Sequence, residues 1–239
     1  MFLFLFLLLS CQMFYYSDEE TKELEVTQVS SEYNIGISKA INSSLKVRSL
    51  LGDVPIGHGS GNLFHMGNRL FVITAAHVVD SGETILLEEH NGNMVEATIA
   101  YENHYTDIAV LLPRGKFDDT ESSAYVVNKN HDIKAKKVHF YGYPQSLEGF
   151  LAVGFVSRSD YRKILLQSYA WFGASGAVVF DSAGRTVGVV SAIVSQIDPY
   201  NGNVITPGNI VVVTRTYDLD RKKIREHLVN EEARSWNPN

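Results

Sequence analysis

From about residue 40 onward, the chain is a succession of short apolar runs separated by turn-forming residues. The runs cover residues 70–74, 84–87, 94–100, 108–112, 137–141, 150–156, 163–167, 177–180, 186–193 and 210–214. Glycine and asparagine mark turns between them, as in Gly67 with Asn68 and Asn91 with Gly92. Apolar runs of this length, closed by such turns, are typical of antiparallel strands. The pattern therefore predicts an all-β fold of antiparallel barrels rather than alternating βαβ units.

A polar stretch over residues 114–134 divides these runs into two sets. We expect it to connect a first barrel, about residues 40–113, with a second barrel, about residues 135–215. The hydrophobic share of 45% is enough to give a chain of 239 residues a buried core. We therefore expect residues 40–239 to form one domain.

The end of the chain carries a different apolar pattern. Leu219, Ile224, Leu228 and Val229 recur at near-helical spacing. This spacing predicts a C-terminal helix over about residues 218–233, which we expect to dock on the second barrel.

The first 16 residues form an apolar leader, which is followed by a charged segment from Asp18 onward. The leader has the length of the apolar part of a signal peptide and is short for a membrane span. A signal peptide, a lipoprotein signal that uses Cys11 and a short membrane anchor all stay open, as does a start codon placed too early. Residues 17–39 are interpreted as a charged linker. An exported or membrane-associated protein is expected, whether periplasmic, at the cell surface or extracellular.

Cysteine content and charge exclude several classes of protein. Cys11 is the single cysteine, so the body of the chain forms no internal disulfide and no thiolate metal site. The net charge is −6, and a surface with this charge repels a phosphate backbone. Nucleic acid is therefore not an expected partner.

A serine between glycines stands out among the polar residues of the second barrel. Ser175 follows Gly173 and Ala174 and precedes Gly176, directly before an apolar run. Such a bend exposes a hydroxyl while neighbouring backbone N–H groups point at one spot, as an acyl-transfer oxyanion requires. Upstream, His77 closes an apolar run and Asp107 precedes another, so that the spacings are 107 − 77 = 30 and 175 − 107 = 68 residues. This order of histidine, aspartate and serine is the order of a chymotrypsin-type catalytic triad.

At these residues the chain resembles a trypsin-like serine peptidase, most closely the HtrA/Deg type, here without a PDZ domain. Further landmarks of the resemblance are the segments 59–61, 142–144 and 154–157. It implies two six-stranded antiparallel β-barrels of the chymotrypsin type with a C-terminal helix. It also implies that His77 is the general base, Asp107 its orienting carboxylate and Ser175 the nucleophile, with the N–H groups of Gly173 and Ser175 as the oxyanion hole.

The resemblance also places a specificity pocket. Its walls would be Tyr169, Ala170, Trp171 and Phe172 before the nucleophile and Val190, Ser191, Ala192 and Ile193 on a later strand. No acid stands at the base of this pocket to pair with Lys or Arg, and Ile193 would narrow its entrance. Small or medium aliphatic side chains are therefore expected before the cleaved bond. The same residues could instead be ordinary core positions of a barrel.

The remaining histidines do not form a metal motif in the sequence, because none has metal-ligand spacing with another ligand. No metal and no cofactor is expected. The chain is interpreted as a serine endopeptidase that hydrolyses protein or peptide substrates through an acyl-enzyme. An inactive relative that only binds peptides and a viral or phage polyprotein-processing peptidase are the alternatives, and the oligomeric state stays open.

Overall fold

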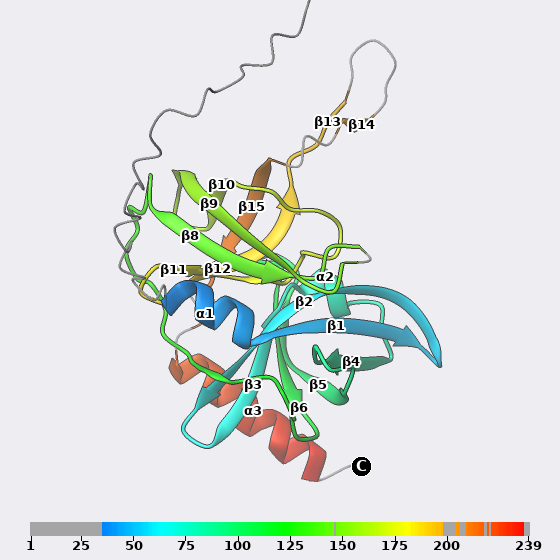
Figure 1. Ribbon diagram of the computed structural model, residues 1–239. Helices are drawn as coiled ribbons and strands as arrows, with labels where there is room; N and C mark the ends of the chain where they lie inside the picture. Colours follow the sequence, from blue (N-terminus) through cyan, green and yellow to red (C-terminus); the bar gives the residue numbers. More distant parts are fainter. Residues whose placement is uncertain are drawn as a thin grey trace, which may run out of the picture. The chain divides into compact units, whose positions relative to one another are not determined.

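The structure is a computed structural model that describes residues 35–145, 147–197, 204–205, 209–217, 219 and 221–236. The leader at 1–16 and the linker up to residue 34 lie outside the described residues. Helix α1 (Ile35–Asn42) is the first described element, and it begins inside the segment interpreted as a linker. Its buried residues Gly36 and Ala40 face the domain, and it packs against the second barrel at β8 and β11 (Figure 1).

Six antiparallel strands close the first barrel in the order β1-β4-β5-β6-β3-β2 (Figure 1). These strands are β1 (Ser44–Leu51), β2 (Val54–Met66), β3 (Arg69–Thr74), β4 (Thr84–Glu88), β5 (Met94–Asn103) and β6 (Ile108–Pro113). The short strand β7 (Ser123–Ala124) is added to β2 in parallel. A single helical turn, α2 (Ala76–Val79), follows β3.

The second barrel is also closed and antiparallel, in the order β10-β15-β12-β11-β8-β9. Its strands are β8 (Lys137–Gly142), β9 (Phe150–Ser159), β10 (Lys163–Gln167), β11 (Val178–Asp181), β12 (Thr186–Ile193) and β15 (Ile210–Arg215). Strands β13 (Gln196–Ile197) and β14 (Val204–Ile205) form a separate two-stranded ribbon. The predicted fold class of two six-stranded barrels with a C-terminal helix is therefore confirmed.

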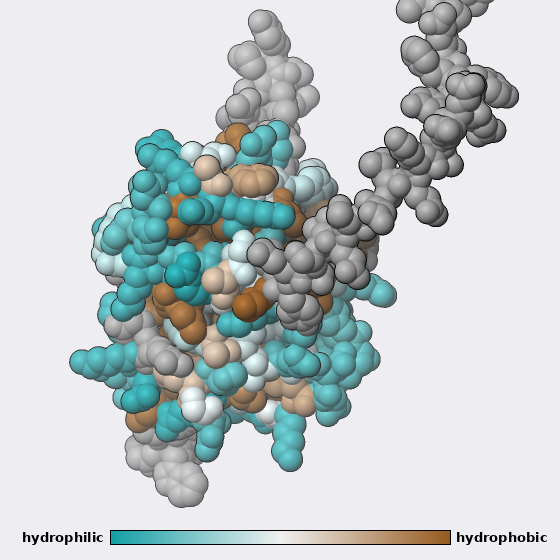
Figure 2. Space-filling view, turned by 60° about the vertical axis from the view of Figure 1, so that its left-hand side comes forward, coloured by the Kyte–Doolittle hydropathy of each residue, from teal (hydrophilic) through white to brown (hydrophobic). Residues whose placement is uncertain are grey.

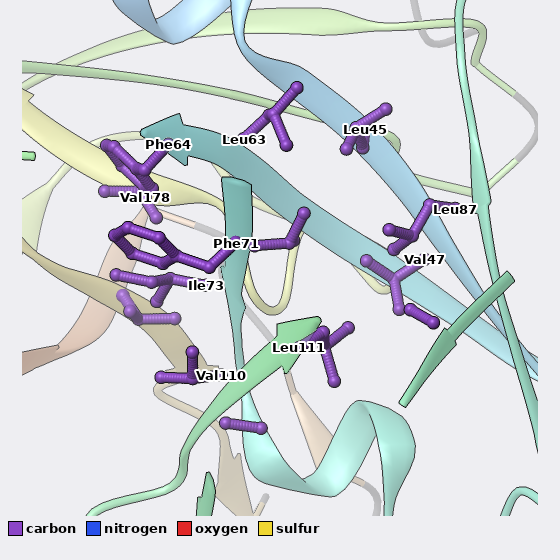
Figure 3. Packing of buried hydrophobic residues seen from close by; sticks show 14 of the residues in the cluster. Leu45, Val47, Leu63, Phe64, Phe71, Ile73, Leu87, Val110, Leu111 and Val178 are labelled. Atoms are coloured by element: carbon purple, nitrogen blue, oxygen red, sulfur yellow. The ribbon is translucent and has the colours of Figure 1, made fainter. Parts of the chain in front are cut away.

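Strand β11 shows how the barrels pack together. Its side chains alternate in direction: Val179 lies in the core of the second barrel, whereas Val178 and Phe180 join the core cluster of the first. Phe180 lies 6.0 Å from Phe64 between ring centroids, and Figure 3 shows Val178 beside Phe64 and Phe71. Because both faces of β11 are buried, its sequence is a continuous apolar run rather than an alternating one.

The C-terminal helix α3 (Arg221–Trp236) docks on the first barrel, so the expectation that it would dock on the second barrel is wrong. Ile224 and Leu228 are fully buried in the core cluster of the first barrel, and the ring of His227 lies 4.4 Å from that of Tyr101 on β5. The buried hydroxyl of Tyr125 donates to the carbonyl of Leu219 and fixes the approach to the helix. The apolar positions of α3 predict a buried face, but they do not specify which barrel it meets.

Polar and apolar residues share the surface of the domain. Figure 2 shows one face, on which hydrophilic residues surround smaller apolar patches. Among the described residues, no helix is long and apolar enough to cross a membrane.

Candidate active site

His77 was expected to close an apolar strand. It lies instead on the helical turn α2, just beyond the end of β3. Its ring Nδ1 lies 2.9 and 3.0 Å from the two carboxylate oxygens of Asp107. The backbone N–H of His77 also donates to Asp107 Oδ1 at 3.0 Å. The side chain of His77 is 49% exposed. With Nδ1 protonated toward the carboxylate, Nε2 is left as a proton acceptor, which is the arrangement of a general base.

Asp107 is held in an unusual backbone conformation between β5 and β6. Its φ of 53° lies in the left-handed region, which residues other than glycine rarely adopt. Just upstream, Asn103 Oδ1 accepts the N–H groups of Tyr105 and Thr106, each at 3.0 Å. This turn ends β5 and directs the carboxylate of Asp107 toward α2.

The second barrel also contacts this carboxylate, through Ser191. The hydroxyl of Ser191 donates a short hydrogen bond to Asp107 Oδ2. Ser191 lies at an irregularity in the pairing of β12 with β15, between Val190 and Ala192. Ser191 was expected to line a substrate pocket, and its hydrogen bond to Asp107 was not foreseen from the sequence.

These hydrogen bonds shift both pKa values. Burial alone would raise the pKa of Asp107, but the hydrogen bonds from the His77 ring, Ser191 and the His77 N–H lower it. The hydrogen bond to Asp107 raises the pKa of His77, and burial offsets part of this increase. Asp107 is therefore ionised and able to stabilise a protonated His77.

Ser175 lies in the turn before β11, and its backbone is anchored to the first barrel. Its carbonyl accepts the N–H of Ser60 on β2 at 2.7 Å. A Cβ on Gly59 would meet both this carbonyl, at 2.8 Å, and the side chain of Val78, the neighbour of His77. A Cβ on Gly176 would meet Thr74 Oγ1 at 2.3 Å. The serine turn thus packs directly against the segment that leads to His77, although no hydrogen bond joins Ser175 to His77 in the described residues.

The carbonyls before Ser175 all have partners. Those of Trp171, Phe172 and Gly173 accept hydrogen bonds from Ala174 N–H at 2.9 Å, Gln145 N–H at 2.7 Å and Ser60 Oγ at 2.7 Å, respectively. By contrast, the N–H groups of Gly173 and Ser175 donate to no acceptor in the part of the chain that the structure describes. Because a peptide's C=O and N–H point in opposite directions, the bond from Gln145 to Phe172 turns the Gly173 N–H away from Gln145. Two free donors beside a serine can stabilise an oxyanion.

Ser60 supports this arrangement from β2. Its hydroxyl donates to Gly173 and accepts the N–H of Tyr143 at 2.9 Å. Sequence reasoning noted Ser60 only as part of a glycine-flanked landmark. Its position between Gly59 and Gly61 was the sequence signal that could have suggested a structural role, and the structure buries it completely.

The residues expected to form the walls of the pocket differ from one another in their exposure to solvent. Ala170 and Val190 are buried in the core of the second barrel, whereas Tyr169 and Phe172 are 50% and 66% exposed. Ala192 is exposed, and Trp171 is partly buried. Ile193 is partly buried and packs against the core of the second barrel.

Comparison with known proteins places the chain in a family. Residues 59–189, more than half of the chain, match the trypsin-like peptidase domain family. The chain is 31% identical over 162 residues to a probable periplasmic serine endoprotease, DegP-like, from Bartonella henselae, covering 63% of this chain and 30% of that protein. It is 27% identical over 155 residues to serine protease HTRA4 from Mus musculus, covering 59% of this chain and 32% of that protein. The match thus spans less than a third of each relative's length.

The fold has a counterpart among solved structures. The serine endoprotease from Yersinia pestis matches with a TM-score of 0.64 at 21% identity, covering 85% of this chain and 69% of that one.

Proposed function

Because the chain belongs to the trypsin-like peptidase family, we propose that it is a serine endopeptidase in which His77, Asp107 and Ser175 act as the catalytic triad. The observation that carries the proposal is a histidine paired with a carboxylate, beside a serine turn with two free N–H donors. These are the parts that acyl transfer from a peptide bond requires.

In this mechanism, Ser175 Oγ attacks the carbonyl carbon of the substrate while its proton passes to His77 Nε2. Asp107 keeps the imidazole in the required tautomer and stabilises the imidazolium. The N–H groups of Gly173 and Ser175 stabilise the negative oxygen of the tetrahedral intermediate. The proton then moves from His77 to the leaving amine, and water hydrolyses the acyl-enzyme by the same steps.

The proposed substrates are proteins or peptides. The exposed residues Tyr169 and Phe172 precede the nucleophile. Ala192 and Ile193 lie on the neighbouring strand β12. We propose that these two segments contact the substrate. The leader at 1–16 and the periplasmic names of bacterial relatives support the proposal that the protein is exported. Whether the leader is cleaved, lipidated or retained as a membrane tether is read by N-terminal sequencing and mass spectrometry of the protein from its native host.

Turnover of an unfolded protein substrate tests the proposal with Ser175→Ala. We expect the rate to fall about 10⁴- to 10⁶-fold, because members of a triad act as a unit. Ser182→Ala, in the exposed turn after β11, is the matched control and should keep wild-type turnover. Unchanged turnover in Ser175→Ala would refute the assignment. A folded wild-type protein that binds peptides without cleaving them would favour the inactive, peptide-binding alternative.

A further inference from the structure

Three side chains of kinds that can bind a metal ion come together from two segments that are distant in the sequence, one just after His77 and the other just before Asp107. Asp80 directly follows helix α2, Glu102 lies near the end of β5, and His104 lies in the turn after it. His104 Nε2 is 3.7 Å from Asp80 Oδ1 and 3.8 Å from Glu102 Oε1. One ligand atom of each residue lies within 4.8 Å of those of the other two. The fold thus creates a cluster that sequence spacing did not indicate.

The spacing of these atoms fits a metal ion. Ligand atoms that bond one zinc ion at 2.0–2.2 Å lie about 3.3–3.6 Å apart in a tetrahedron, so the 3.7 and 3.8 Å distances from His104 Nε2 are only slightly too wide. A contraction of a few tenths of an ångström would therefore bring both distances into this range. The side chains of Asp80 and His104 are 56% and 60% exposed, so an ion can reach them from solvent.

The buried oxygen of Glu102 points to the same conclusion independently. Glu102 Oε1 is shielded from solvent and has no hydrogen-bond partner, although the Glu102 side chain as a whole is 25% exposed and His104 Nε2 lies 3.8 Å from this oxygen. A shielded carboxylate oxygen without a hydrogen bond is unfavourable, and a second carboxylate nearby adds repulsion. In the described part of the chain, neither Asp80 nor Glu102 forms an ion pair with Lys or Arg. A divalent cation would satisfy the oxygen and neutralise both acids.

We propose that Asp80, Glu102 and His104 form a binding site for a divalent transition-metal ion of the zinc type, with water in the open position. One imidazole and two carboxylates suit zinc, whereas Ca²⁺ and Mg²⁺ prefer oxygen ligands alone. A bound ion links the end of α2, which carries His77, to the segment that leads to Asp107. The site therefore restrains the two segments that hold this pair. The proposal does not depend on the peptidase assignment.

Absorption titration of the full chain with Co²⁺ tests the proposal, because four-coordinate cobalt has intense visible bands. We expect one Co²⁺ per chain, displaced by Zn²⁺. Loss of an outer-shell partner already weakens metal binding about 10- to 100-fold, so loss of a ligand in His104→Ala should weaken it by more than about 100-fold. Glu102→Gln should weaken binding as well, and His131→Ala, an exposed histidine elsewhere, should not. Zn²⁺ should also raise the Tm of the wild type and of His131→Ala but not that of His104→Ala.

Three results would overturn the proposal. The first is Co²⁺ binding that survives both His104→Ala and Glu102→Gln. The second is binding that is lost in His77→Ala but kept in His104→Ala, which would place the ion at the His77–Asp107 pair. The third is a thiolate-to-cobalt charge-transfer band, which would assign the ion to Cys11.

Discussion

The two halves of the candidate site are held in place by different kinds of hydrogen bond. On the first barrel, His77 and Asp107 are fixed by side-chain hydrogen bonds, with Ser191 reaching across from the second barrel. On the second barrel, the turn that ends in Ser175 is fixed through its backbone, by partners for three successive carbonyls. The base half should therefore respond to changes in side-chain chemistry, and the nucleophile half to changes in backbone geometry.

Asp107→Asn should cause the largest loss through a side chain. An amide at this position favours the wrong tautomer of His77, and we expect kcat to fall about 10⁴-fold while the fold is retained. Asp53→Asn, in the exposed turn between β1 and β2, is the control. Steady-state kinetics and circular dichroism measure both variants. Near-normal kcat in Asp107→Asn would mean that the base half is not held in this way.

Gly173→Ala tests the nucleophile half, because it adds the smallest possible side chain to the backbone of the turn. The φ of Gly173 is +97°, and a Cβ there would lie 2.4 Å from the carbonyl of Tyr143. The peptide must therefore move, and loss of an oxyanion donor reduces kcat about 10²- to 10³-fold.

Gly92→Ala is the matched control for this variant, because Gly92 also has a positive φ, +84°, but has no atom within 4 Å of the added Cβ. It should lower Tm slightly and leave turnover unchanged. Equal losses of turnover in the two variants would attribute the effect to general strain and not to the oxyanion donor.

The smallest expected effect concerns the pKa of His77. Histidine NMR titration should place the pKa of His77 above the ordinary value of about 6.5, because the hydrogen bond to Asp107 raises it. The pKa of His58, which burial lowers, should appear below that value in the same spectra. In Asp107→Asn the midpoint of His77 should fall, and no change would contradict the pairing.

The sign of the pH dependence follows from this shift. In the proposed mechanism, activity needs neutral His77 and should decline as pH falls through its raised pKa. Stability behaves oppositely: the contribution of the pair is fully present below the unfolded-state pKa of histidine and is lost as pH rises through the folded-state pKa.

Most of the strands that form the two barrels could be predicted from apolar runs, and two of them could not. The runs at 163–167 and 186–193 coincide with β10 and β12. Strands β1 and β2 were missed, and β2 contains Gly57, Gly59 and Gly61, which have low strand propensity. Its pairing with β1 and β3 supplies what local propensity lacks. Gly59 and Gly61 are needed there because an added Cβ would come within 3 Å of neighbouring side chains.

The candidate site was predictable in composition but not in geometry. The order of His77, Asp107 and Ser175 suggested the residues through a family resemblance. The left-handed backbone of Asp107, the bond from Ser191 and the bond from Gln145 to Phe172 depend on contacts between segments far apart in the sequence. A local pattern carries no information about such contacts.

Labelling with a fluorophosphonate probe tests the central claim most directly, because the probe reacts only with a serine that is activated as a nucleophile. Peptide mapping of the labelled protein should place one adduct on Ser175. The adduct should be lost in His77→Ala and retained in the control Ser182→Ala. An adduct on another serine, or none on protein that is folded and cleaving substrate, would contradict the account.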